Sequence, residues 1–237
     1  MKKVGIIIFI AALVIGVVVA NVFSFGSIRA ENLKPSFLSF SFKSGIKGSG
    51  NIVTENRELR DFKSIDVSSI FDIEIASQKD FSVQIDADDN LLQYIKTEVN
   101  DGVLGISLEK RVHTSGPIKI RIGAPDIEKI EASGAVKVSL VDLNNSLLTV
   151  DSSGASRIIV RGKTARLNVD VSGASKIEAE ELVAENALVD SSGASKVRVN
   201  VLGELTADAS GASSVSYVGT PANVIKKTSG AGKVFSK

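Results

Sequence analysis

Carboxylate side chains that recur at a regular spacing are the residues of this chain whose types could do chemistry. Five acidic residues, here called the acidic column, follow one another at intervals of 18 to 20 positions: Glu131, Asp151, Asp170, Asp190 and Asp208. On neighbouring strands their carboxylates would stand about 5 Å apart. Oxygen ligands at such a spacing could share a Ca²⁺ ion, which takes six to eight of them.

A second set of residues, here called the basic column, offers a different interpretation of these carboxylates. Its members are Lys137, Arg157, Lys176, Lys196 and Lys233, and four of the five follow an acidic residue by six positions. Stacked like charges repel each other, so we predict that the two columns neutralise one another across a tight turn. The Gly-Gly-x-Gly-x-Asp repeat of Ca²⁺-binding solenoids is absent. The paired-charge interpretation is therefore favoured over a metal site, and no cofactor is expected.

Other residue types that commonly carry catalysis are scarce. His113 is the single histidine, and without an acid–base partner at a readable spacing it is expected to be an exposed turn residue. The absence of cysteine removes thiolate metal ligands and a cysteine nucleophile. The net charge of +1, without a basic cluster, argues against nucleic acid as a partner. We predict no catalytic residues and no enzymatic activity.

The tripeptide Ser-Gly-Ala separates the two columns and recurs six times. The Ser-Gly pairs are Ser133-Gly134, Ser153-Gly154, Ser172-Gly173, Ser192-Gly193, Ser210-Gly211 and Ser229-Gly230. A fixed period of about 19 residues, flanked by alternating apolar and polar residues, is typical of an all-β solenoid with one coil per repeat. Glycine suits a sharp corner because it tolerates positive φ and close backbone approach, and small neighbours can stack between coils. We interpret these residues as structural turns.

Two degenerate copies extend the repeat toward the N-terminus, at residues 65–73 and 112–120. Between them the sequence predicts a strand at 81–87, a short helical stretch at 91–95 and a hairpin around Asn100-Asp101-Gly102. Residues 88–90 are candidate N-caps for the helical stretch. This excursion is expected to cover the first coils, because the open end of a solenoid exposes unpaired backbone.

The first 29 residues form a separate unit. Lys2-Lys3 precedes an uncharged stretch that runs from Val4 to Phe25. It is long enough for a transmembrane helix with its N-terminus in the cytoplasm. A cleaved signal peptide ending near Ala20 is the alternative, and both interpretations export the remainder. Residues 30–50 are expected to be a linker rich in Ser, Phe, Lys and Gly, and residues 51–237 the solenoid domain.

Several stretches together resemble the bacterial head GIN domain family, described as autotransporter adhesins. They are Gly48-Ser49-Gly50-Asn51-Ile52-Val53-Thr54-Glu55-Asn56-Arg57, Phe71-Asp72-Ile73-Glu74-Ile75, Ala87-Asp88-Asp89-Asn90-Leu91-Leu92 and the serial Ser-Gly-Ala-Ser-Lys turns. The resemblance covers about four-fifths of the chain, from Gly48 to the C-terminus. It implies an exported, right-handed parallel β-helix related in shape to pectin lyases, with no known catalytic set.

The sequence therefore predicts a non-enzymatic, membrane-anchored β-solenoid that acts as an adhesin or contacts another component of the cell envelope. Its anchor would lie in the inner membrane, with the solenoid facing the periplasm or the exterior. Two alternatives remain: a polysaccharide-active enzyme of pectin-lyase-like shape, and an accessory protein of an envelope stress system. The ligand is an unidentified protein or glycan surface. An uncapped last coil, around Lys233, would also allow homo-oligomers.

Overall fold

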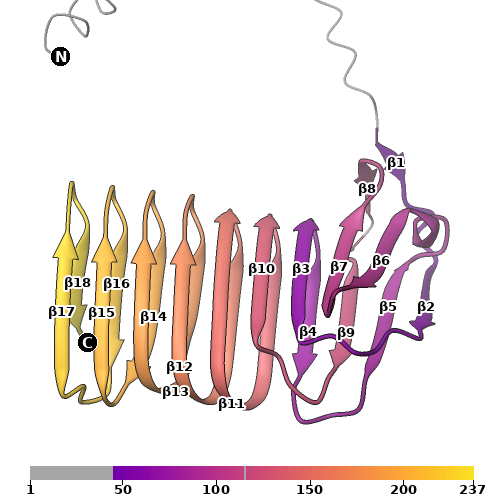
Figure 1. Ribbon diagram of the computed structural model, residues 1–237. Helices are drawn as coiled ribbons and strands as arrows, with labels where there is room; N and C mark the ends of the chain where they lie inside the picture. The colour runs from indigo at the N-terminus through magenta and orange to yellow at the C-terminus, as the bar shows by residue number, and fades with distance from the viewer. Residues whose placement is uncertain (1–44, 115) are drawn as a thin grey trace, which may run out of the picture. The chain divides into compact units, whose positions relative to one another are not determined.

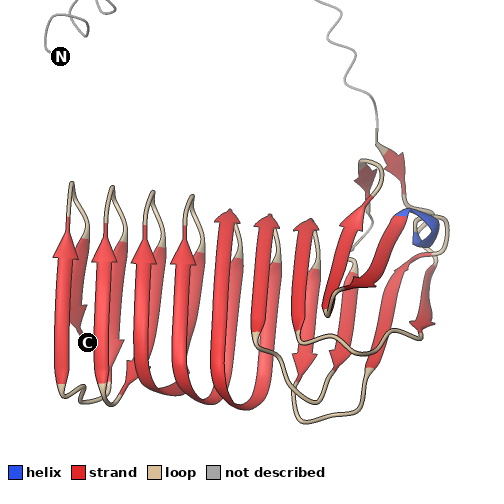
Figure 2. Ribbon diagram, in the orientation of Figure 1, coloured by secondary structure: helices blue, strands red, loops and turns tan. Residues whose placement is uncertain are grey.

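The structure is a computed structural model that describes residues 45–114 and 116–237, and in this part the chain is all-β apart from one short 3-10 helix (Figures 1 and 2). The strands of the coils are β3 (Ser64–Ser69), β4 (Asp72–Ala76), β9 (Lys119–Gly123), β10 (Lys129–Gly134), β11 (Lys137–Gly154), β12 (Arg157–Val171), β13 (Lys176–Ser191), β14 (Lys196–Val201), β15 (Glu204–Ala209), β16 (Ser214–Val218), β17 (Asn223–Thr228) and β18 (Lys233–Ser236). The predicted β-solenoid is confirmed.

The coils build two parallel layers that face each other (Figure 1). The front sheet contains the strands that run toward the Ser-Gly-Ala corners, in the order β3-β10-β11-β12-β13-β15-β17. The rear sheet contains the strands that leave the corners, in the order β9-β4-β11-β12-β13-β14-β16-β18. The long strands β11, β12 and β13 give their second halves to the front sheet and their first halves to the rear sheet.

The core fills the space between the two sheets. Inward residues of the front sheet, such as Ile130 and Val150, and of the rear sheet, such as Val138 and Ile158, are at most 1% exposed. Their neighbours in sequence point outward, because successive side chains of a strand alternate between faces. The first degenerate copy joins this pattern, since Ile65 pairs with Ile130 in register.

The second bend of each long coil carries no repeated motif. Strands β11 and β12 pass through it with register shifts between Leu140 and Leu143 and between Ile159 and Gly162. Asp142 and Gly162 have positive φ angles there, 59° and 134°. The backbone therefore turns through local irregularities that differ from coil to coil, and no sequence signal marks them.

The N-terminal end of the solenoid is covered by segments that precede the first degenerate copy, lie between the two copies, or begin the second copy. They are β1 (Ile46–Lys47), β2 (Ile52–Arg57), β5 (Ser82–Asp88), η1 (Leu92–Tyr94), β6 (Ile95–Asn100), β7 (Val103–Leu108) and β8 (Val112–His113). Strands β5 and β2 extend the rear sheet in antiparallel fashion, β7 adds to the front sheet beside β3, and β6 pairs with β7 as a hairpin. The predicted strand, helical turn, hairpin and covering role are confirmed.

The predicted N-cap residues form other hydrogen bonds. Residue Leu91 occupies the N-cap of η1 without a side-chain hydrogen bond. Asp88 Oδ1 instead accepts from the Gly50 N–H at 2.6 Å, and Asp89 Oδ1 accepts from the Ser49 hydroxyl at 2.5 Å. These carboxylates hold Ser49 and Gly50, which the sequence placed in the linker, against the end of the solenoid.

The second degenerate copy joins the solenoid only in its second half. Lys119 pairs with Asp72, as the repeat predicts. Val112 and His113 do not enter the front sheet, however, and pair with Ile46 and Lys47. The prediction for this half was wrong because β7 already occupies the free edge of β3.

The N-terminal unit, residues 1–29, and most of the linker lie outside the described residues. No helix within residues 45–114 and 116–237 is long and apolar enough to cross a membrane.

Candidate functional site

The corner glycines form a backbone ladder along one edge of the solenoid. Gly173, for example, has a φ angle of 83°, and a Cβ added to it would lie 2.5 Å from the carbonyl oxygen of Gly154 in the preceding coil. Both reasons expected from the sequence for glycine, positive φ and close backbone approach, hold here. The ladder begins at Ser69, which pairs with Gly134 and has a φ angle of 92°. The first corner of the ladder, which has no corner stacked before it, can therefore carry a side chain.

Buried serines line the inside of these corners. Ser175 Oγ accepts from the Ser156 N–H at 3.2 Å and lies 3.0 Å from the Ser152 hydroxyl. In the next coil the Ser191 and Ser195 hydroxyls lie 2.7 Å apart. These hydroxyl groups satisfy backbone and side-chain polar groups that the tight corner removes from water. The serines that follow four of the six Ser-Gly-Ala tripeptides, Ser156, Ser175, Ser195 and Ser213, are therefore structural.

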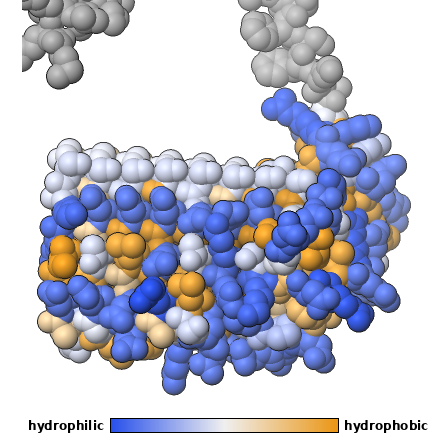
Figure 3. Space-filling model, viewed as in Figure 1, coloured by the Kyte–Doolittle hydropathy of each residue, from blue (hydrophilic) through white to orange (hydrophobic). Residues whose placement is uncertain are grey.

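The acidic column lies in register along the outer face of the front sheet. Asp66 extends it at one end, and Lys227 follows Asp208 at the other. The corner serines Ser133 and Ser153 form the neighbouring column. Figure 3 shows the result on this face: a pale edge of small residues and a hydrophilic band beneath it.

The predicted neutralisation of the acidic column by the basic column was wrong. Both columns point outward, but they belong to different sheets and therefore cover opposite faces of the solenoid. Members of the basic column pair within the rear sheet: Lys137 Nζ lies 3.1 Å from Asp72 Oδ2, and Arg157 Nε lies 2.7 Å from Glu178 Oε2. For Lys137, Arg157 and Lys176 the ion-pair partner is a carboxylate of the same sheet.

The acidic column is thus only partly compensated. Lys129 Nζ contacts Glu131 and lies 3.1 Å from Asp151 Oδ2. Among the described residues, Asp170, Asp190 and Asp208 form no ion pair. Desolvation, followed by the charges of neighbouring carboxylates in the column, raises the pKa of Asp170. The front face therefore presents a line of negative charge.

Metal ligation finds no support in this arrangement. No group of three or more His, Asp or Glu side chains within residues 45–114 and 116–237 is placed to hold a metal ion. His113 is an exposed residue of the short strand β8. It lies in a strand pair with β1 where the sequence predicted a turn.

A hollow on the outer face of the rear sheet was missed by the sequence reasoning. Its volume is about 730 Å³, and its floor is made by outward positions of β9, β4, β11 and β12: Gly123, Ala76, Val141 and Ile159. Gly123 and Ala76 have little or no side chain, whereas the residues around them have long side chains. Small residues at outward positions of neighbouring strands were the available signal, and only the strand pairing brings them together.

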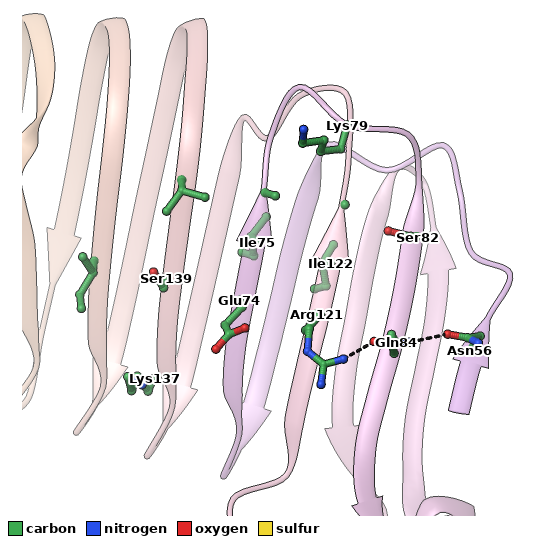
Figure 4. Close-up of a pocket in the computed structure, with 14 residues that line it drawn as sticks. Asn56, Glu74, Ile75, Lys79, Ser82, Gln84, Arg121, Ile122, Lys137 and Ser139 are labelled. Atoms are coloured by element: carbon green, nitrogen blue, oxygen red, sulfur yellow. Dashed lines mark hydrogen bonds between the residues drawn. The ribbon is translucent and has the colours of Figure 1, made fainter. Parts of the chain in front are cut away.

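The rim of the hollow is polar and held by hydrogen bonds (Figure 4). Arg121 donates to Gln84 and to Asp86, and Gln84 Nε2 donates to Asn56 Oδ1 at 3.0 Å. Asp86 also accepts from the Thr54 hydroxyl at 2.8 Å. Glu74, Lys79, Ser82, Lys137 and Ser139 complete the polar lining.

Comparisons with known proteins show which solved structures share this fold. No curated protein matches the sequence. A crystal structure described as a "putative adhesin" from Bacteroides fragilis is similar at 22% identity with a TM-score of 0.67, over 81% of this chain and all of that one. Another "putative adhesin", from Parabacteroides merdae, is similar at 18% identity with a TM-score of 0.53, over 81% of this chain and 98% of that one. At these identities the likeness shows a shared fold.

The family assignment comes from the sequence. Residues 61–221 match the family model described as "Putative auto-transporter adhesin, head GIN domain". This range holds the coils from Phe62 to β16 and most of the N-terminal cover, whereas β17 and β18 lie beyond it. The resemblance to the head GIN domain family is therefore confirmed over residues 61–221, and the chain belongs to this family.

Proposed function

We propose that this protein is an exported, membrane-anchored, right-handed β-solenoid that adheres to its partner through its outer faces and catalyses no reaction. Residues 1–29 supply the anchor in this proposal. The solenoid then faces the periplasm or the exterior. Family membership supports the adhesive, exported role.

The observation that carries the proposal is the unbroken front face. From Asp66 to Lys227 the outward residues stay in register over successive coils. Stacked coils make long regular surfaces of the kind that repeat proteins use for binding. A catalytic site needs a few unlike groups that converge on one point, and such a site interrupts a repeat. The front face instead repeats an acidic residue in register from Asp66 to Asp208, beside exposed apolar residues such as Leu188 and Ile225.

The line of carboxylates gives this face its chemistry. Asp170, Asp190 and Asp208 have no ionic partner among the described residues, so a cationic surface can approach them without displacing one. Such a contact between exposed charges weakens as salt is added. Adhesion through this face is thus expected to be salt-sensitive.

The test uses vesicles that display the full-length protein, applied to immobilised bacterial envelope. We expect saturable retention above that of empty vesicles, reduced by added salt. A triple variant, Asp170→Asn with Asp190→Asn and Asp208→Asn, should reduce retention. The control is Glu181→Gln, which removes an exposed carboxylate at the second bend of its coil, outside the acidic column. Retention no better than that of empty vesicles contradicts the adhesive role, and metal-dependent turnover of polyuronates contradicts the absence of catalysis.

A further inference from the structure

We propose that the hollow on the rear sheet binds an acidic oligosaccharide, a chain of sugars that carry carboxylates. This inference goes beyond the proposed contact of the front face with a cationic surface, and assigns a second binding site with its own class of ligand to the rear face. The floor, the polar rim and the charge of the hollow each contribute to the argument.

The floor suits the apolar face of a sugar ring. Val141 and Ile159 are half-buried residues whose side chains point outward beside Ala76 and Gly123. A side chain at Gly123 is excluded by the local backbone, because a Cβ there would lie 2.6 Å from Ser82 Oγ and 2.7 Å from the Asp80 carbonyl oxygen. The chain that follows β4 therefore passes so close to Gly123 that no side chain can fill this part of the hollow.

The rim offers a row of hydrogen-bonding groups at a regular spacing. Asn56, Gln84, Arg121, Glu74 and Ser139 occupy registered positions on β2, β5, β9, β4 and β11. Neighbouring strands stand about 4.8 Å apart, which is close to the length of one sugar unit in an extended chain. A glycan that crosses the strands would thus meet one polar side chain per sugar.

The hydrogen bonds among these side chains prepare the site for a ligand. Arg121 is held between Gln84 and Asp86, and Gln84 is held by Asn56. Figure 4 shows this chain of contacts along the strands of the rear sheet. Side chains that are already ordered lose less conformational freedom when they bind.

The charged side chains around the hollow favour an anionic ligand. Arg121 is paired with Asp86, Lys137 with Asp72, and Glu74 with Lys119. Lys79 lines the hollow and has no ion pair among the described residues. One cation is therefore left over, and a sugar carboxylate would be its counterpart.

A peptide fits this position less well than a glycan. Extended peptides dock by adding a strand to a free sheet edge, where backbone groups are unpaired. Strands β5, β9, β4 and β11 lie inside the sheet and pair on both sides. The hollow therefore offers only side-chain groups for hydrogen bonding. Such groups suit a carbohydrate, which has many hydroxyl groups.

The experiment measures binding of fluorescently labelled hexagalacturonate to the full-length protein in detergent, by fluorescence polarisation. Saturable binding is expected, and it should be much weaker for the methyl-esterified form of the same oligosaccharide, which has no charge. Lys79→Ala should raise Kd about two- to fivefold, as expected for an exposed ion pair. Ala76→Leu, which fills the hollow, should raise Kd more than tenfold. The matched control Lys196→Ala removes an exposed lysine of the same sheet, outside the hollow, and should leave Kd unchanged.

Three outcomes overturn the inference: no binding of the acidic oligosaccharide, equal loss in Lys79→Ala and Lys196→Ala, or equal affinity for hexaglutamate, which would indicate a general preference for anions. The vesicle adhesion assay separates this failure from failure of the proposed function. If adhesion persists but the oligosaccharide does not bind, only the glycan site is contradicted. A partial loss of adhesion in the Ala76→Leu variant, while its circular dichroism spectrum is unchanged, supports both.

Discussion

The substitution Gly173→Ala tests how the solenoid is held together. Gly173 has a φ angle of 83°, and its added Cβ would lie 2.5 Å from the Gly154 carbonyl oxygen and 2.9 Å from the Gly154 nitrogen. A left-handed conformation costs an L-residue about 1–2 kcal/mol. Forcing apart two packed backbones adds about 1–3 kcal/mol. We therefore expect a loss of about 2–5 kcal/mol in the free energy of unfolding.

Two other glycines separate these contributions. Gly102 also has a positive φ angle, 76°, but its added Cβ would meet nothing nearer than 3.9 Å. Gly102→Ala should therefore show the conformational cost alone, about 1–2 kcal/mol. Gly116 has open space around its Cβ position and no positive φ angle, so Gly116→Ala should be close to neutral.

The assay is thermal unfolding of the full-length protein followed by circular dichroism. For a domain of this size each kcal/mol lowers Tm by about 2–4 °C. Gly173→Ala should thus lower Tm by about 4–20 °C, and clearly more than Gly102→Ala. Equal shifts for these two variants would refute the argument that stacked corner backbones exclude a side chain.

Further predictions concern the buried serines, the acidic column and metal ions. Ser175→Ala should cost about 1–3 kcal/mol in urea unfolding because it leaves a buried backbone N–H without a partner, whereas the exposed Ser153→Ala should be neutral. The pKa of Asp170 is raised by burial and by neighbouring carboxylates, so its ionisation opposes folding, and this penalty is absent below the carboxyl range and appears as pH rises through the folded pKa. Asp170→Asn should accordingly raise the urea midpoint at neutral pH, with a gain that vanishes at acidic pH; a gain that persists there would argue against this cause. Addition of EGTA should leave Tm unchanged, and a large fall would restore the Ca²⁺ interpretation of the acidic column.

Local signals were sufficient for the regular coils. The corner glycine, the alternation around it and the Asp101-Gly102 turn each depend on residues adjacent in sequence. Their geometry is set by φ preferences and by the two-residue period of a strand. The coil register and the hairpin could therefore be predicted, and both were confirmed.

Charge pairing could not be predicted in the same way. Asp170 and Lys176 are six residues apart and both point outward, so sequence spacing alone made them apparent partners. The corner between them places Asp170 on the front sheet and Lys176 on the rear sheet. Lys176 contacts Glu178 instead, at 2.5 Å between Nζ and Oε1. Which face a column occupies is a property of the folded coil.

By itself the sequence determined the β-solenoid, its repeat length, the glycine corners and the family, because each of these is written into a local pattern that recurs. Only the tertiary structure decided which segments of the N-terminal cover pair with the first coils. It also decided that the acidic and basic columns lie on opposite faces, and that Ala76, Gly123 and Val141 meet in one hollow. These features depend on contacts between residues far apart in the chain, and strand pairing in three dimensions is what selects those contacts.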